Sequence, residues 1–184
     1  NIVDAKSPFT GDHSVKVSHV CTYIGNKLGL TQKKIETLYL AALLHDLGKL
    51  RVDDSILEKK GPLSKEEKII MDRHGFDSEM VLRQIDGFKE VALLASSHHE
   101  TLDGKGYPYQ KTESELSIES RILMLSDVFQ ALVQNRPYRK QLSAPEIMKI
   151  LYAMQAERKI DLHVLKVIED NLDELYSIAD RSSK

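Results

Sequence analysis

The sequence predicts an all-α fold, and three observations carry this prediction. Apolar residues recur at helical spacing through most of the 184 residues, as in Val17, Val20, Ile24 and Leu28. No segment shows the sustained period-two alternation that is typical of a half-buried strand. Several apolar runs follow a Ser that has Glu three residues later, a pattern that caps helix N-termini. The length suits one domain with a substantial core.

The helical pattern divides the chain into eight segments and one short turn. Gly29 is placed to end the first helix, and Ser64 with Glu67 and Ser143 with Glu146 form capping boxes. The other expected N-caps are Asp12, Thr31 and Ser117. The predicted helices cover residues 12–28, 31–44, 64–74, 77–85, 88–99, 118–134, 144–157 and 161–178, with the turn at 55–57. We expect a linker at 1–11, one domain at 12–178 and a tail at 179–184.

Composition and charge exclude several classes of protein. A net charge of −2 argues against a protein that binds nucleic-acid polymers through a general basic field. The single Cys21 excludes an intramolecular disulfide and fits a reducing compartment. No apolar run approaches the roughly 18 residues of a membrane span, and no signal-peptide pattern is present. We therefore expect a cytoplasmic piece of a larger regulatory protein, since the chain begins with Asn1 rather than Met.

The most informative stretch is LLHDLGK at residues 43–49, at the end of a strongly apolar segment. It places an imidazole and a carboxylate, His45 and Asp46, where a buried face is expected. Burial of both groups is costly unless they gain a partner, and a divalent metal ion is a strong one. Gly48 is placed to end the helix, and Lys49 follows as a cation just outside it. The stretch therefore predicts a metal centre.

Five histidines and two aspartates form the predicted ligand set, namely His13, His45, Asp46, His74, His98, His99 and Asp127. Most of them lie at predicted helix ends. Asp127 instead shares an apolar helix face that carries no Lys or Arg at helical spacing, so it needs another partner. Such a set can hold two borderline metal ions with one bridging Asp. The alternative is that each residue is an ordinary helix residue, the interpretation that we give to His19 and His163.

Three basic residues are predicted to act on a substrate. Arg136 and Arg139 flank Pro137, and a guanidinium can bind two phosphate oxygens at once. An ion pair with a nearby acidic residue is the structural alternative. Lys49 lies beside the predicted metals, where it could donate a proton to a departing alkoxide or hold a phosphate. The remaining lysines are expected to be solvated.

Longer motifs carry a resemblance to a known family. The HDxGK run at 45–49, HHExxDGxGYP at 98–108, Asp127 and RPYR at 136–139 closely resemble the HD-GYP family. This family is a bacterial branch of the HD-domain metal-dependent phosphohydrolases. The resemblance runs from about Thr10 to the region of Asp161, and the loop motif is its most specific part. It implies a helical bundle with a metal centre between helices and a long loop that carries Gly-Tyr-Pro.

The resemblance also implies an activity and roles for residues. The activity is hydrolysis of cyclic di-GMP to pGpG or GMP, with two or three metal ions, commonly iron or manganese. One ion would be held by His13, His45, Asp46 and Asp127, and the other by His74, His98 and His99 with Asp46 as the bridge. Lys49 would assist the leaving group, and the substrate would contact Asp103, Gly106, Tyr107, Pro108, Arg136 and Arg139. The loop is also implicated in contacts with diguanylate cyclase domains, and a homodimer is left open.

Three departures from the family pattern bear on the metal count and the substrate. Members with three metals carry a Glu where this chain has Phe9, so two metals are expected. The usual acidic-Gly-Leu stretch after Pro108 is YQK here, at residues 109–111. Gln130 replaces an Asp that is common one turn beyond the metal Asp. The last two changes lie near the expected substrate edge and leave 3′,3′-cyclic GMP-AMP as an alternative substrate.

The sequence thus predicts a metal-dependent phosphodiesterase, in which a hydroxide that bridges two ions attacks a cyclic dinucleotide. Asp46 and Lys49 are the residues expected to act at the reacting atoms. One rival is a phosphohydrolase that acts on ordinary nucleotides, and a panel of substrates would distinguish it. Another is a catalytically weak cyclic-dinucleotide sensor or docking module, which would bind tightly and form no product.

Overall fold

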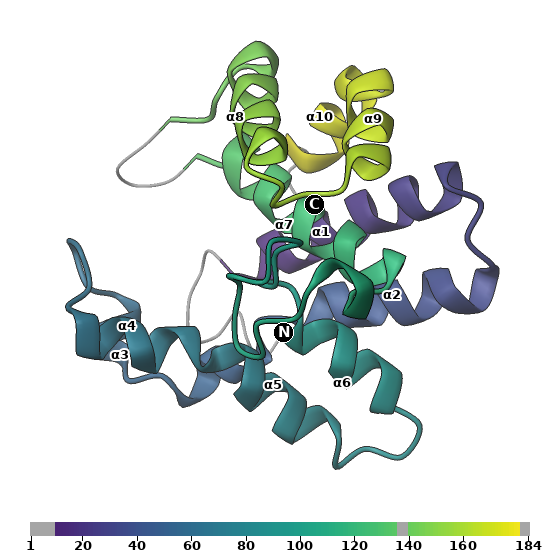
Figure 1. Ribbon diagram of the computed structural model, residues 1–184. Coiled ribbons are helices and arrows are strands. Elements are labelled where there is room, and N and C mark those ends of the chain that lie inside the picture. The colour runs from purple at the N-terminus through teal and green to yellow at the C-terminus, as the bar shows by residue number, and fades with distance from the viewer. Residues whose placement is uncertain (1–9, 136–139, 181–184) are drawn as a thin grey trace.

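The computed structural model describes residues 10–135 and 140–180, and its regular elements are helices (Figure 1). No strand occurs within these ranges, where Asp103 and Thr112 form an isolated bridge. The elements are α1 (Thr10–Lys27), α2 (Gln32–Leu44), η1 (Leu47–Arg51), α3 (Asp54–Leu57), α4 (Lys65–Asp72), α5 (His74–Leu82), α6 (Lys89–Ser96), η2 (Glu113–Glu115), α7 (Ile118–Val133), α8 (Ala144–Ala156), α9 (Leu162–Asp170) and α10 (Leu172–Asp180). The all-α prediction is confirmed.

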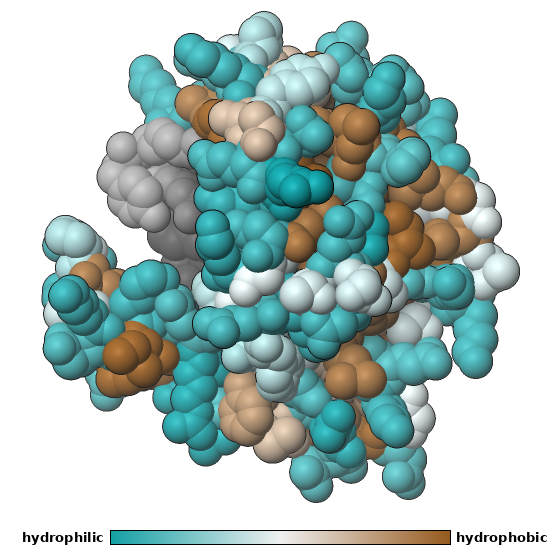
Figure 2. Space-filling view, viewed as in Figure 1, coloured by the Kyte–Doolittle hydropathy of each residue, from teal (hydrophilic) through white to brown (hydrophobic). Residues whose placement is uncertain are grey.

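Helices α1 and α7 occupy the middle of the bundle. α1 packs against α2, α7 and α10, while α6 packs against α2 and α5 (Figure 1). The short helices α3 and α4 form an arm that projects from the body, and Figure 2 shows apolar surface on this arm. Ile69 and Ile70 of α4 are 71% and 45% exposed. None of the described helices is both long and apolar enough to cross a membrane.

The core forms where the apolar stripes of the central helices face each other. Val17, Val20 and Ile24 of α1 are fully buried, at the helical spacing that the sequence predicts. Ile122 and Phe129 of α7 are also fully buried in the same cluster. This core fixes α1 against α7, and these two helices carry His13 and Asp127.

Several predicted helix ends are found in the structure. Ser64 accepts a hydrogen bond from the backbone N–H of Glu67, and the Glu67 carboxylate accepts from the N–H of Ser64. Ser143 and Glu146 form the second capping box at the start of α8. Gly29 follows α1 with a φ of +71°, the left-handed conformation that commonly ends a helix.

The predicted boundary between helices at residues 74–77 was wrong. The helix predicted at 64–74 ends at Asp72, and His74 is the first residue of α5. The break has a side-chain cause, because the imidazole Nδ1 of His74 lies 2.7 Å from the carbonyl oxygen of Met71. The ring thereby adds a hydrogen bond to a carbonyl in the last turn of α4, beside the one that the N–H of Arg73 donates.

The helix predicted at 161–178 is also divided, into α9 and α10. Asn171 separates them with a φ of −130°, and its side-chain amide donates to the carbonyl oxygen of Val167 at 2.8 Å. The amide oxygen of Asn171 in turn accepts from the Tyr23 hydroxyl at 2.9 Å, which links this break to α1. The expected cap at Asp12 was wrong as well, since Asp12 lies inside the first turn of α1 and pairs with Lys16 at 2.6 Å.

Candidate metal centre

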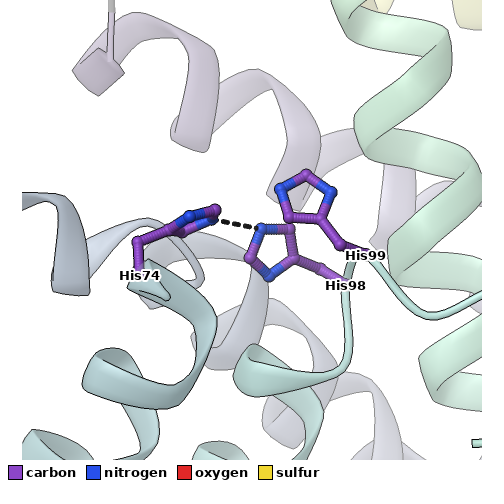
Figure 3. Close-up of side chains that lie close together, drawn as sticks. All are labelled: His74, His98 and His99. Carbon is purple, nitrogen blue, oxygen red and sulfur yellow. Dashed lines mark hydrogen bonds between the residues drawn. The ribbon is translucent and has the colours of Figure 1, made fainter. Parts of the chain in front are cut away.

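The predicted ligands come together from five separate segments of the chain. His13 lies on α1 and Asp127 on α7, while His45 and Asp46 follow α2 directly. His74 opens α5, and His98 and His99 follow α6; Figure 3 shows the rings of these three histidines turned toward one another. Except for Asp127 and His99, which are partly exposed, these side chains are buried.

Asp46 lies at the centre of the cluster. Its Oδ1 is 3.4 Å from Nε2 of His74 and 3.9 Å from Nε2 of His98. Its Oδ2 is 3.5 Å from Nε2 of His45 and 2.7 Å from Nζ of Lys49. Burial alone would raise the pKa of Asp46, but the charges of Lys49 and the surrounding histidines lower it well below the ordinary value. Asp46 is therefore a carboxylate at neutral pH.

A second group lies on the other side of His45. Nε2 of His13 is 3.0 Å from Oδ1 of Asp127, and Nε2 of His45 is 3.9 Å from the same oxygen. Burial would raise the pKa of Asp127, but its hydrogen bond and charge interaction with His13 lower it. Nε2 of His45 thus faces both carboxylates.

Three of the histidines are oriented by the same device. In each, Nδ1 donates to the backbone carbonyl three residues earlier, in the last turn of the preceding helix, where carbonyls lack intrahelical partners. The pairs are His45 with Ala42 at 2.7 Å, His74 with Met71 at 2.7 Å, and His98 with Ala95 at 2.6 Å. Because Nδ1 must carry the proton to donate, Nε2 of each neutral ring presents a lone pair to the centre.

Two observations show that this arrangement fits a cation. Nε2 of His74 and Nε2 of His98 are only 3.1 Å apart (Figure 3), although each neutral ring has its proton on Nδ1. Burial, followed by the charges of neighbouring histidines, lowers the pKa of His98 well below its ordinary value, so this ring stays neutral. In addition, the buried Oδ1 of Asp46 has no hydrogen-bond partner within the described part of the chain. A positive ion would satisfy all three atoms.

The donor atoms form three overlapping groups, each with its atoms within 4.8 Å of one another. They are His74 with His98 and His99, His13 with His45 and Asp127, and His45 with Asp46 and His98. The third group joins the other two. Imidazole nitrogens and carboxylate oxygens without thiolates suit borderline divalent transition metals. The residues present therefore fit a metal centre.

Gly48 allows the chain to approach α5 closely. A Cβ at this position would lie 2.0 Å from the carbonyl oxygen of His74 and 2.7 Å from the backbone nitrogen of Ser78. The Ser78 hydroxyl accepts from the N–H of Gly48 and donates to the carbonyl oxygen of His45, both at 2.8 Å. Gly48 was predicted to end a helix, but it lies inside η1, where its role is to hold His45 and Asp46 against His74.

The loop after His99 begins with a second close approach. A Cβ on Gly106 would lie 2.4 Å from Cα of Glu100 and 2.5 Å from the carbonyl oxygen of His99. This contact brings the ring of Tyr107 to 4.7 Å from the ring of His99 and 6.4 Å from that of His74. Tyr107 therefore forms one edge of the centre.

A buried carboxylate fixes the same loop from inside. Glu100 is 1% exposed, and its two oxygens accept the backbone N–H groups of Tyr109 at 2.6 Å and Lys111 at 2.9 Å. The side chain of Asp103 accepts from the Thr101 hydroxyl at 2.6 Å and from the N–H of Lys105 at 3.2 Å. Glu100 was not singled out from the sequence, although an acidic residue directly after the paired histidines was a usable signal.

The remaining predicted residues are distributed as follows. Pro108 packs against α5, where a Cβ on Gly75 would lie 3.5 Å from its Cδ. His19 and His163 take no part in the cluster, in line with their assignment as ordinary helix residues. Phe9, Arg136, Pro137 and Arg139 lie outside the described residues, so the predicted phosphate contacts stay predictions.

Comparison with known proteins places this geometry in a family. A family model described as HD domain matches residues 1–164. A relative from Vibrio cholerae, named 3′3′-cGAMP-specific phosphodiesterase 1, is 40% identical over 179 residues, which are 97% of this chain and 42% of that protein. The cyclic di-GMP phosphodiesterase response regulator RpfG of Xanthomonas campestris is 36% identical over 142 residues, covering 76% of this chain and 38% of RpfG. The chain thus spans well under half of these relatives.

The fold is also found among solved structures. The structure of Bd1817, an HDG"Y"P protein from Bdellovibrio bacteriovorus, superimposes with a TM-score of 0.71. The match covers 89% of this chain and 52% of that one, at 23% sequence identity. At this level of identity the likeness establishes the helical architecture, which agrees with the bundle predicted from the sequence.

Proposed function

Since this chain belongs to the HD-domain family, in its HD-GYP branch, we propose that it is a metal-dependent phosphodiesterase that hydrolyses cyclic di-GMP. The observation that carries the proposal is the convergence of unprotonated imidazole nitrogens on the unpartnered Oδ1 of Asp46. Such a cluster lowers the folding stability of the metal-free chain, and bound ions would offset this cost. The named activities of the relatives support the reaction class.

Two divalent ions, iron or manganese, suit the ligand set. His13, His45 and Asp127 would hold one ion, and His74, His98 and His99 the other, with Asp46 between them. Ions in these positions would supply Lewis acidity toward a phosphoryl oxygen and lower the pKa of an attacking water. The absence of thiolate from the described cluster and the number of imidazoles favour borderline transition metals over Mg²⁺ or Ca²⁺.

Four side chains are proposed to act on the substrate directly. Lys49 keeps its Nζ 2.7 Å from Oδ2 of Asp46, and its side chain is 24% exposed, so Nζ can reach a bound substrate. We assign to it the donation of a proton to the leaving 3′ oxygen. Tyr107 borders the site beside His99 and would position the substrate. Arg136 and Arg139 are proposed to bind its phosphates.

One specific observation favours 3′,3′-cyclic GMP-AMP as an alternative substrate. The Vibrio cholerae relative that is named for this activity matches 97% of the chain, against 76% for RpfG. The chain-specific residues Tyr109 and Lys111 also lie in the loop that borders the centre. Docking of diguanylate cyclase domains on this loop, a homodimer and a cytoplasmic location stay predictions.

The decisive experiment joins metal analysis with turnover. Protein purified without oxygen would be loaded with Fe(II) or Mn(II), its metal content measured, and both cyclic dinucleotides supplied as substrates. We expect about two ions per chain and formation of pGpG or GMP from cyclic di-GMP. Asp46→Asn should lose metal and turnover together. His163→Asn is the matched control, because this side chain is 88% exposed and belongs to none of the candidate ligand groups.

Each contrary outcome points to a defined alternative. Faster turnover of 3′,3′-cyclic GMP-AMP than of cyclic di-GMP would identify the former as the preferred substrate. Two ions without turnover of either compound, but with tight binding, would mean a sensor or docking module. Turnover of ordinary nucleotides alone would indicate a general phosphohydrolase. A folded protein that binds no metal would refute the proposed metal centre.

A further inference from the structure

His13 is the one ligand of its group whose Nδ1 meets another side chain. It lies inside α1, which continues to Lys27, so the nearby backbone carbonyls are already bonded within the helix. The device used by His45, His74 and His98 is therefore not open to it. Instead, the side-chain oxygen Oε1 of Gln130 accepts the hydrogen bond from Nδ1 of His13. Gln130 was noted in the sequence only as a departure from a family pattern.

Gln130 is placed for this contact at an evident structural cost. It lies on α7, three residues after Asp127, and is fully buried. Its second amide atom, Nε2, is buried without a hydrogen-bond partner among the described residues. An unpaired buried donor destabilises a fold, and an apolar side chain of similar size would avoid the cost. Stability alone therefore does not explain a glutamine here.

We propose that Gln130 is a positioning residue for the metal centre, an inference that rests on the proposed function. By accepting from Nδ1, it keeps a proton on that nitrogen and leaves Nε2, which faces Asp127, as the ring atom that can bind an ion. Nε2 of His13 lies 3.0 Å from Oδ1 of Asp127, so both atoms can bind one ion. α7 thus supplies a ligand and, one turn later, the group that orients a second ligand from α1.

The charge of this partner sets an expected order of affinities. A carboxylate that accepts from Nδ1 makes imidazole a stronger ligand than a neutral amide does. Gln130→Glu keeps the acceptor and adds charge, so it should bind the ion as tightly as the wild type or more tightly. Gln130→Met removes the acceptor and also the unpaired donor, so it should weaken binding by about 10- to 100-fold without lowering the stability of the metal-free chain.

The test measures Mn(II) binding to the metal-free full chain by calorimetry and by loss of the free-ion EPR signal. Gln155→Met on α8 is the matched control, since it makes the same change on a helix that carries no ligand. We expect one of two binding steps to weaken in Gln130→Met, with the thermal midpoint of the metal-free protein unchanged or higher. Wild-type affinity for both steps in Gln130→Met would overturn the inference.

A purely structural role would give a different pattern. The affinities of both variants would then fall together with the thermal midpoint of the metal-free chain, and this result would also overturn the inference. The test also distinguishes failure of the proposed function from failure of this inference. A wild-type chain that binds no Mn(II) would refute the metal centre itself, whereas unchanged binding in Gln130→Met with turnover intact would refute only the role of Gln130.

Discussion

Gly48→Ala tests whether the contact between η1 and α5 sets the metal centre. The added Cβ would lie 2.0 Å from the carbonyl oxygen of His74, whereas real Cβ contacts stay above about 3.0 Å. The atoms that the new Cβ would meet, the carbonyl oxygen of His74 and the nitrogen of Ser78, both belong to the backbone of α5. This backbone must therefore move away by about 1 Å, because no flexible side chain can give way instead. His74 moves with α5, whereas Asp46 moves with η1. Metal–ligand distances tolerate about 0.2 Å, so the displacement is roughly five times too large.

The same displacement has a cost in stability. Overpacking of this kind typically costs about 1–3 kcal/mol. For a chain of 184 residues, each kcal/mol lowers the melting temperature by about 2–4 °C, which gives a decrease of about 2–12 °C. The variant also strains the hydrogen bond between the N–H of Gly48 and the Ser78 hydroxyl, which is 2.8 Å long. We expect a folded but weakened protein.

Calorimetric titration with Mn(II), together with thermal unfolding of the metal-free chain, would measure both effects. Gly48→Ala should lose at least one binding step, since His74 can no longer share an ion with Asp46. Gly25→Ala is the matched control, because its Cβ would come no closer than 3.4 Å to a side-chain atom, and alanine favours α1 by about 1 kcal/mol. If folded Gly48→Ala binds Mn(II) like the wild type, the reasoning about this contact fails.

Three further predictions concern neighbouring features. Removal of metal by a chelator should lower the melting temperature, because an ion at about 100 times its Kd contributes about 2.7 kcal/mol; an unchanged midpoint would argue against a folded-state metal site. Lys49→Met should leave metal content intact but reduce kcat by about 10²–10⁴-fold, as expected for loss of a general acid; wild-type kcat would remove Lys49 from the mechanism. Glu100→Gln should loosen the loop, because a neutral amide replaces a carboxylate that accepts two backbone N–H groups. Faster tryptic cleavage at Lys105, whose side chain is 82% exposed, would report this loosening, and an unchanged rate would contradict it.

The sequence predicted those features that depend on local chemistry. Capping residues such as Ser64 and Ser143 act within three residues, so their pattern is visible without the fold. The clustering of the candidate ligands was also predictable, because histidines and aspartates on apolar segments need a common partner. Their position beside helix ends proved informative, since His45 and His98 use the carbonyls that those ends leave free.

The features that were missed depend on contacts between distant segments. The role of Gly48 depends on the backbone of α5, about 30 residues later in the chain. Gln130 meets His13 across 117 residues of sequence. The division at Asn171 likewise combines a local bond to Val167 with a distant one from Tyr23. No periodicity or spacing within one segment contains this information.

The way in which the histidines are oriented explains how the proposed centre would depend on metal. Carbonyls in the last turn of a helix lack i+4 partners and can accept further hydrogen bonds, so placing the Nδ1–H groups on those of α2, α4 and α6 adds little cost. The same choice directs the Nε2 lone pairs of His74 and His98 to within 3.1 Å of each other, beside the unpartnered Oδ1 of Asp46. In the metal-free chain these lone pairs repel one another, and the packing of the surrounding core must offset that repulsion. A bound ion would convert it into coordination, and folding stability and metal binding would then be coupled at these atoms.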